Sequence, residues 1–251
     1  MTNTLFEWIS DEKFYEVVDT CFKSSIKKFA DDETPNKLDP TLVVAMSSLM
    51  DLSIPEVTDK MKMYGKIKTL QNGIGRFHES ILGSANGWMR FEKKGGVFDI
   101  YSLDPVELAG NRKVVAEIKM RYNTIKGVDE CKTFDKLKDA SASRGGVDEC
   151  VAYLVQIVPK NNECYNRPWK VSNRVPIENV RCIDGRSAYH LVTGSPTAFD
   201  DVMRALPSAL QRSLEKASED PSIDWTRSLS NTIIETAVNL SIPKESAFSD
   251  E

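Results

Sequence analysis

The feature that most constrains the fold is a short segment in which strand-like alternation coincides with acidic and basic side chains. Residues 113–121 read KVVAEIKMR. Side chains alternate between the two faces of a strand. One face then carries Val115, Glu117, Lys119 and Arg121, and the other carries only the apolar Val114, Ala116, Ile118 and Met120. The pattern predicts a strand with one buried face and one face that presents an acid and a lysine.

A second acid precedes this strand. Asp99 lies near the start of another strand-like stretch, Val97–Leu103, and a turn connects the two. If the two strands form a hairpin, Asp99 and Glu117 come close together beside Lys119. Two neighbouring carboxylates repel each other, a divalent cation relieves that repulsion, and oxygen ligands favour hard ions such as Mg²⁺ or Mn²⁺. A lysine beside such an ion can orient a water molecule or stabilise charge on a phosphate.

The arrangement of Asp99, Glu117 and Lys119 resembles the PD-(D/E)XK nuclease core. Phe98 stands where the motif has proline, and this departure removes no chemical group from the site. An amphipathic edge strand with solvated charges would show the same spacing, so the motif alone leaves both interpretations open.

Further segments carry a more specific resemblance, in order, over about residues 70–210. They are residues 77–88, 119–124, 154–160, 181–189 and 190–194. Together with the hairpin they are similar to the type II restriction endonucleases that recognise GGNCC-type sites. The resemblance implies a magnesium-dependent DNA endonuclease, with Mn²⁺ able to substitute, that acts as a homodimer on a short palindromic duplex site. The first ~60 and last ~35 residues carry no such resemblance.

Composition supports a reduced, non-exported protein. The five cysteines are widely spread and show no C-x-x-C spacing, which argues against a zinc site or a disulfide framework. No long apolar run suggests a membrane span, and the first residues lack the pattern of a signal peptide. We expect a cytoplasmic protein of a prokaryote, without an organic cofactor.

The net charge of −4 does not suggest DNA binding, but the charges are unevenly distributed. Basic residues outnumber acidic ones between residues 157 and 186. The basic residues are Lys160, Arg167, Lys170, Arg174, Arg181 and Arg186, and the acidic residues are Glu163, Glu178 and Asp184. Beyond residue 214, acids outnumber bases. A locally basic surface can therefore bind phosphates although the sum is negative.

Helices are expected in the first third of the chain. Apolar residues recur at helical spacing from Phe14, after a start at residues 10–12. Asp39-Pro40 predicts the cap and first turn of a second helix, and the capping-box pattern from Ser53 to Glu56 predicts a third, which continues with a break toward Ile81.

Alternation of period two then predicts strands. They are Trp88–Phe91, Val97–Leu103, Val114–Arg121 and Cys150–Val158, and a helix over Thr133–Ala140 makes a crossover between the last two. Further helices are expected over Pro196–Ala217 and Trp225–Leu240. The predicted fold is α/β (α+β), a central mixed β-sheet flanked by helices in one domain, 1–251. Residues 1–85 are mainly helical, 86–194 hold the catalytic sheet and DNA-reading loop, and 195–251 hold the C-terminal helices.

Several site residues remain open to two interpretations. Glu79 lies near the end of a predicted helix, where relatives of this nuclease core place an additional metal-binding acid, but it would also fit as a surface residue. Asp104 rivals Asp99, although Asp104-Pro105 fits the start of a turn better. His78 and His190 are the two histidines, and we interpret His78 as a packing or helix-surface residue.

Base reading requires side chains that match base edges. Arginine and lysine read guanine, and asparagine suits adenine. The predicted DNA-binding residues are Arg121, Asn123, Lys160, Asn162, Arg167, Lys170 and Arg186. The loop Asn161–Arg174, with Tyr165 and Trp169 among basic residues, is the expected place of DNA contact, although any one of these charges could serve only as a phosphate contact.

The sequence thus predicts a site-specific endonuclease in which Asp99 and Glu117 bind the ion, with Glu79 as a third acid, and Lys119 assists the attacking water. Two rivals use the same fold. One is a repair or recombination nuclease that cuts by DNA structure, and the other is a DNA-binding module without activity. The presence of all three motif residues argues against the inactive module.

Overall fold

The computed structural model of the chain describes residues 5–30, 38–91, 96–125, 127–217 and 231–249. Within these ranges one six-stranded mixed sheet forms the centre, with strand order β1-β2-β3-β4-β6-β5. The strands are β1 (Trp88–Arg90), β2 (Ile100–Ser102), β3 (Lys113–Arg121), β4 (Cys150–Val158), β5 (Asn166–Pro168) and β6 (Val180–Asp184). The mixed sheet with flanking helices confirms the predicted fold class.

The sheet combines an antiparallel half with a parallel half. β1, β2 and β3 pair antiparallel, β3 runs parallel to β4 and β4 to β6, and β5 pairs antiparallel with β6. The parallel β3–β4 pair requires a crossover, which α4 (Val128–Ala142) provides as predicted. Strand β2 begins three residues later than expected, whereas the predicted bounds of β4 are confirmed.

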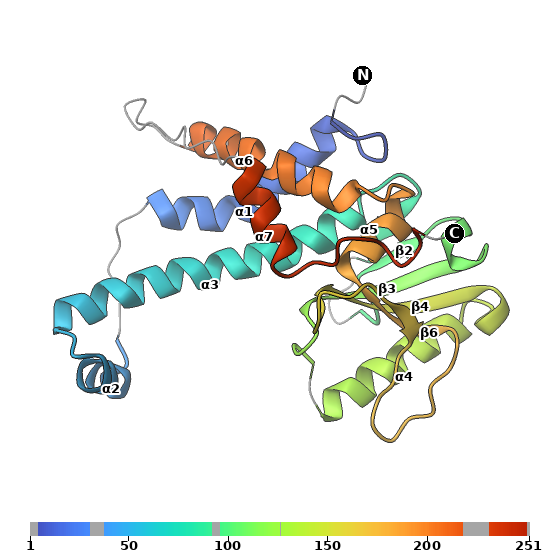
Figure 1. Cartoon of the computed structure of the whole chain (residues 1–251), viewed down its shortest axis with the longest axis horizontal. Coiled ribbons are helices and arrows are strands. Elements are labelled where there is room, and N and C mark those ends of the chain that lie inside the picture. Colours follow the sequence, from blue (N-terminus) through green and yellow to red (C-terminus); the bar gives the residue numbers. More distant parts are fainter. Residues whose placement is uncertain (1–4, 31–37, 92–95, 126, 218–230, 250–251) are drawn as a thin grey trace.

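Helices cover both faces of the sheet (Figure 1). The helices are α1 (Asp11–Ala30), α2 (Pro40–Met50), α3 (Ile54–Leu82), α4, α5 (Gly185–Thr193), α6 (Ala198–Ala217) and α7 (Asn231–Asn239). The larger core lies between one face of the sheet and helices that include α1, α3, α5 and α6. A smaller core lies between the other face and α4. These two cores explain why β4 is buried along almost its whole length.

The predicted helix starts are confirmed in their local chemistry. The Asp39 carboxylate caps α2 by accepting a hydrogen bond from the Thr41 backbone N–H (2.9 Å), and Pro40 occupies the first position of the helix. The Glu56 carboxylate accepts from the backbone N–H of Ser53 (2.8 Å), as the capping box requires.

The predicted break in α3 is wrong, because the helix runs unbroken for 29 residues. At Gly73, α3 packs closely against α1, because a Cβ at this position would lie only 2.9 Å from the Cys21 carbonyl oxygen. The glycine thus permits close approach of two helices and does not end one. The predicted helix Trp225–Leu240 is described only from Asn231, since residues 218–230 lie outside the described ranges.

The sequence interpretation missed β5 and β6. Val180–Asp184 is a strand, and α5 begins directly at Gly185. A Cβ on Gly185 would lie 2.4 Å from the Ile157 carbonyl oxygen, so glycine is needed where strand passes into helix beside β4.

Among the described residues no single helix is long and apolar enough to cross a membrane. Helices α2 and α3 pass that test only as a pair, and they meet at a bend of 113°. All five cysteines are free thiols.

Candidate active site

The hairpin predicted from the sequence places Asp99 beside the Glu117–Lys119 segment. The backbone N–H of Asp99 donates to the Ala116 carbonyl (2.9 Å), which aligns the residue with the middle of β3. Its carboxylate Oδ2 accepts from the backbone N–H of Ile118 (2.7 Å). Asp99 is therefore held against the residue that separates Glu117 from Lys119.

Glu117 and Lys119 share the β3 face that is only partly covered. The other face of the strand is apolar and buried, as predicted, with Val114, Ala116 and Ile118 all in the larger core. Lys119 Nζ lies 2.5 Å from Glu117 Oε1, and the side chains are 28% and 17% exposed. The two charged groups thus lie at the border between core and solvent, where a substrate phosphate can reach them.

Electrostatics at this border favour binding of a cation. Burial and the neighbouring Asp99 carboxylate raise the pKa of Glu117. Burial by itself would lower the pKa of Lys119, but the nearby carboxylates, Glu117 first, raise it above its ordinary value. The raised pKa favours the protonated form of Lys119 at neutral pH, which can donate hydrogen bonds and positive charge.

Glu79 lies in the last turns of α3, near this cluster. Burial and then the Asp99 carboxylate raise the pKa of Glu79 to about 7, while Arg90 acts in the opposite direction. Arg90 Nη2 is 4.0 Å from Glu79 Oε2. A carboxyl group with such a raised pKa binds protons or cations readily near neutral pH.

The donor set fits an ion that binds few protein ligands. In the part of the chain that the structure describes, no group of three or more His, Cys, Asp or Glu side chains is arranged to hold a metal ion. Asp99, Glu117 and Glu79 therefore do not form a three-carboxylate ligand group in this structure, which leaves at most two of them as direct ligands of one ion. Mg²⁺ commonly keeps several waters and binds through one or two carboxylates, so the residues fit this ion.

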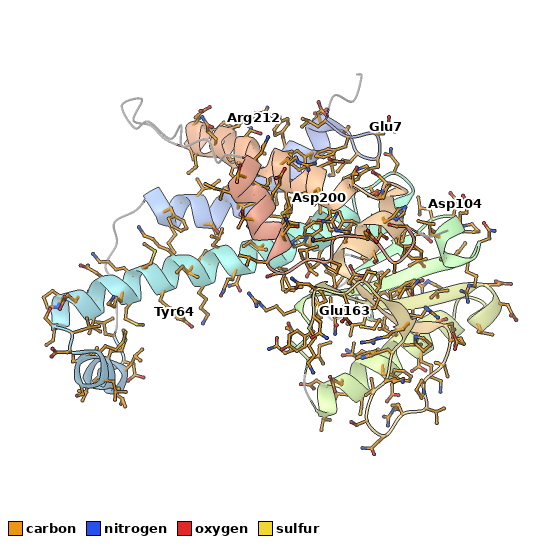
Figure 2. The ribbon with its side chains drawn as sticks, viewed as in Figure 1. Glu7, Tyr64, Asp104, Glu163, Asp200 and Arg212 are labelled. Carbon is orange, nitrogen blue, oxygen red and sulfur yellow. The ribbon has the colours of Figure 1, made fainter. Side chains whose placement is uncertain are left out.

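Asp104 lies away from this cluster. It is exposed in the turn after β2, where the sequence placed it, and Figure 2 shows it at the rim of the molecule. His78 is buried, and its Nδ1 lies 2.8 Å from the Tyr189 hydroxyl, which agrees with a packing role.

One residue next to the site, Gln156, was missed by sequence reasoning. Gln156 of β4 is in register with Lys119 on one side and with Asp184 of β6 on the other. The Tyr165 hydroxyl donates to Gln156 Oε1 (2.6 Å). Gln156 thus connects the β3–β4 pair, at the level of Lys119, to the loop that follows β4. A polar residue near the end of an otherwise apolar strand was the signal that could have identified it.

Asp184 anchors the same loop. It is fully buried, caps α5 through the Ser187 backbone N–H (3.1 Å), and accepts from the Tyr165 backbone N–H (2.9 Å). Asp184 therefore fixes the start of α5 and the position of Tyr165.

The predicted DNA-binding residues differ in their accessibility. Those that lie exposed on the surface are Arg121, Asn123, Lys160, Asn162, Arg167 and Lys170. Arg167 stacks over the Tyr165 ring with 5.0 Å between guanidinium and centroid. The Asn162 side-chain amide donates to the Asn239 carbonyl of α7 (3.1 Å). Trp169, expected in the contact loop, is buried against Phe134 and is not available to a ligand.

Arg186 requires a correction. Its side chain is 7% exposed, pairs with both carboxylate oxygens of Asp200, and donates to the Pro243 carbonyl (2.6 Å). These bonds occupy the guanidinium in the interior, so it cannot reach a base edge. Arg174 and Arg181 also have acidic partners, Asp135 and Glu178. The accessible positive charge of this region therefore belongs to Lys160, Arg167 and Lys170.

Comparison with known proteins agrees with this geometry. The Eco47II restriction endonuclease family model matches residues 6–215. The chain belongs to the Eco47II restriction endonuclease family. It is 35% identical over 224 residues to the type II restriction enzyme Eco47II of Escherichia coli, with 83% of this chain and 87% of that enzyme covered.

A second member of this group of enzymes is more distant. The type II restriction enzyme Sau96I of Staphylococcus aureus is 22% identical over 274 aligned positions, which cover 99% of this chain and all of that enzyme. The Eco47II family match spans α1 to most of α6, and it therefore includes Glu79, the hairpin and the loop with Tyr165.

Proposed function

We propose that the chain is a type II restriction endonuclease that hydrolyses double-stranded DNA in a magnesium-dependent reaction. The observation that carries this proposal is the hydrogen bond from the Ile118 backbone N–H to the Asp99 carboxylate, which holds an acid beside Glu117 and Lys119. Membership of the Eco47II family supports the same activity.

In the proposed mechanism Asp99 and Glu117 hold Mg²⁺, for which Mn²⁺ can substitute, and Glu79 adds negative charge nearby. The bound ion supplies Lewis-acid polarisation of the scissile phosphate and of water. Lys119 donates hydrogen bonds to the attacking water and to the phosphate oxygens. Because it is protonated at neutral pH, its charge stabilises the additional negative charge of the pentavalent transition state.

The proposed substrate is a short palindromic GGNCC-like site, bound by a homodimer so that each subunit reads one half. Exposed basic side chains near the site support this substrate. They are Arg121 at the end of β3 and Lys160, Arg167 and Lys170 around β5. Guanine is read well by a bidentate arginine or by lysine, so at least one of these side chains should contact a base edge. The others, with Asn123 and Asn162, would position the DNA backbone.

A binding experiment tests this proposal. Affinity for a GGNCC duplex and for a scrambled duplex is measured in Ca²⁺, which should support binding better than cleavage. We expect tighter binding to the GGNCC duplex and a steep loss of affinity with added salt. Equal affinity for both duplexes, with preferred cleavage of branched or flapped DNA in Mg²⁺, would instead indicate a structure-specific repair nuclease.

A further inference from the structure

An apolar arm extends from the body of the protein, formed by α2 and residues 54–72 of α3 (Figure 1). Helix α2 has no buried residue, although its only polar side chains are Thr41, Ser47 and Ser48. In α3 no residue between Val57 and Gly73 is buried. At ~1.5 Å per residue this stretch is roughly 20 Å long.

The arm exposes large hydrophobic side chains from both helices. In α2 these are Leu42, Val44, Leu49 and Met50, and in α3 they are Ile54, Met63, Tyr64 and Ile67. Leu49 is 86% exposed and Val44 65%. Met63, Tyr64 and Ile67 have the spacing of one helix face, and Figure 2 shows Tyr64 on the part of α3 that lies beyond the body. Contiguous exposed apolar surface of this kind usually marks a protein interface.

The charges of the arm identify the partner that it fits. From residue 39 to residue 59 the charged residues are all acidic, namely Asp39, Asp51, Glu56 and Asp59. From residue 60 to residue 72 they are all basic, namely Lys60, Lys62, Lys66 and Lys68. Lys66 lies over the Phe29 ring of α1 (5.7 Å to the centroid), whereas Lys60 and Lys68 are exposed and available to a partner. An arm with an acidic half and a basic half is complementary to a second copy of itself in antiparallel orientation.

We propose that the arm binds the arm of a second copy of this chain and forms the dimer interface. In this two-fold arrangement the acidic half of one arm lies against the basic half of the other, and the apolar faces of α2 and α3 are covered. The inference rests on the proposed function, because a palindromic site requires two copies.

Two other occupants fit less well. DNA is one of them. The acids of residues 39–59 would repel DNA phosphates, and α2, which lies within this range, carries no positive charge that could bind them. A membrane span needs about 20 apolar residues, whereas α2 is only 11 residues long and charged residues follow in α3. A second copy satisfies both the apolar surface and the two signs of charge.

Sedimentation velocity of the full chain tests the proposal. We expect the wild type to be dimeric and the double variant Leu49→Asp, Val44→Asp to raise the dimer dissociation constant by at least about a hundredfold, since charges replace the apolar contact. Val147→Asp, at a half-exposed position in the body, is the matched control and should stay dimeric. Circular dichroism verifies that each variant keeps its helices.

Charge reversal gives a second test that does not depend on the apolar substitutions. A variant with Lys60→Glu and Lys68→Glu and a variant with Asp51→Lys and Asp59→Lys should each be monomeric, because all four side chains are exposed. An equimolar mixture should form a heterodimer. A monomeric wild type, a dimer that survives both sets of substitutions, or flotation of the wild type with phospholipid vesicles would overturn the proposal.

The test is independent of the chemistry. Lys119→Met should abolish cleavage and leave the sedimentation of the dimer unchanged. Failure of the proposed function would appear as absent cleavage by a normal dimer. Failure of the inference about the arm would appear as cleavage-competent protein whose association does not depend on the arm.

Discussion

The Asp99 carboxylate accepts a 2.7 Å hydrogen bond from the backbone N–H of Ile118, the residue between Glu117 and Lys119. This bond joins the start of β2 to the middle of β3, so the acid of one strand cannot move independently of the acid and lysine of the next. Such fixed geometry is what a catalytic site requires, because its charges must be in place before the transition state forms.

Substitution of the three residues should abolish cleavage while the fold remains. We expect Asp99→Asn, Glu117→Gln and Lys119→Met each to lower the single-turnover rate by on the order of a thousandfold or more, because each removes several kcal/mol of transition-state stabilisation. Asp104→Asn is the matched control, since this acid is exposed in the next turn. Full activity of Asp99→Asn with loss in Asp104→Asn would transfer the role to Asp104.

Glu79 should lower stability at high pH. Its folded-state pKa of about 7 lies above the ordinary 4.5, so the fold favours the protonated form. This stabilisation is complete below the unfolded-state pKa and is lost as pH rises through the folded-state pKa. In EDTA, Glu79→Gln should therefore be more stable than wild type by about 2 kcal/mol at about pH 8 and nearly equal at about pH 4. Denaturant unfolding at both pH values measures this difference, and an equal effect at both would contradict it.

Arg186 and Arg167 should behave differently when each is changed to alanine. Arg186→Ala leaves the partly buried Asp200 carboxylate without its partner, so we expect a loss of about 3 kcal/mol in unfolding free energy. Arg167→Ala should leave stability nearly unchanged and weaken DNA binding, because Arg167 is exposed. Thermal unfolding and DNA titration of both variants distinguish these outcomes. A stable Arg186→Ala that loses selectivity for one base would restore the original prediction for Arg186.

Tyr165→Phe should lower the cleavage rate clearly while it reduces the free energy of unfolding only slightly. The change removes one hydrogen bond to Gln156, which costs about 1 kcal/mol of stability. Because Gln156 lies beside Lys119 in the sheet, a freed Gln156 should disturb the catalytic strand and lower the rate at saturating DNA by about tenfold. Tyr122→Phe, at an exposed position, is the control. If both variants cut at the wild-type rate, Tyr165 only packs the loop.

The features that the sequence predicted well are those encoded by local pattern. Strands β3 and β4 follow from alternation and from a continuous apolar run, and the caps at Asp39 and Ser53 follow from side chains within three residues. The hairpin with the candidate site was also predictable, because Asp99 directly precedes β2, and β2 pairs with β3, which carries Glu117.

The features that were missed depend on distant partners. Strand β6 has only five residues and is specified by its pairing with β4, so its own sequence did not reveal it. Arg186 looked like a base-reading residue because nothing nearby in sequence reveals that Asp200 and the Pro243 carbonyl enclose it. Tertiary contacts of this kind override local propensity and cannot be read from spacing.

The most direct test of the central claim is digestion of plasmid DNA of known sequence, with the ends mapped by sequencing. With Mg²⁺ we expect discrete fragments whose ends all lie at GGNCC-like sites, and no cleavage in excess EDTA or by Lys119→Met. Cleavage undiminished in EDTA, ends scattered without a common sequence, or normal digestion by Lys119→Met would contradict the account.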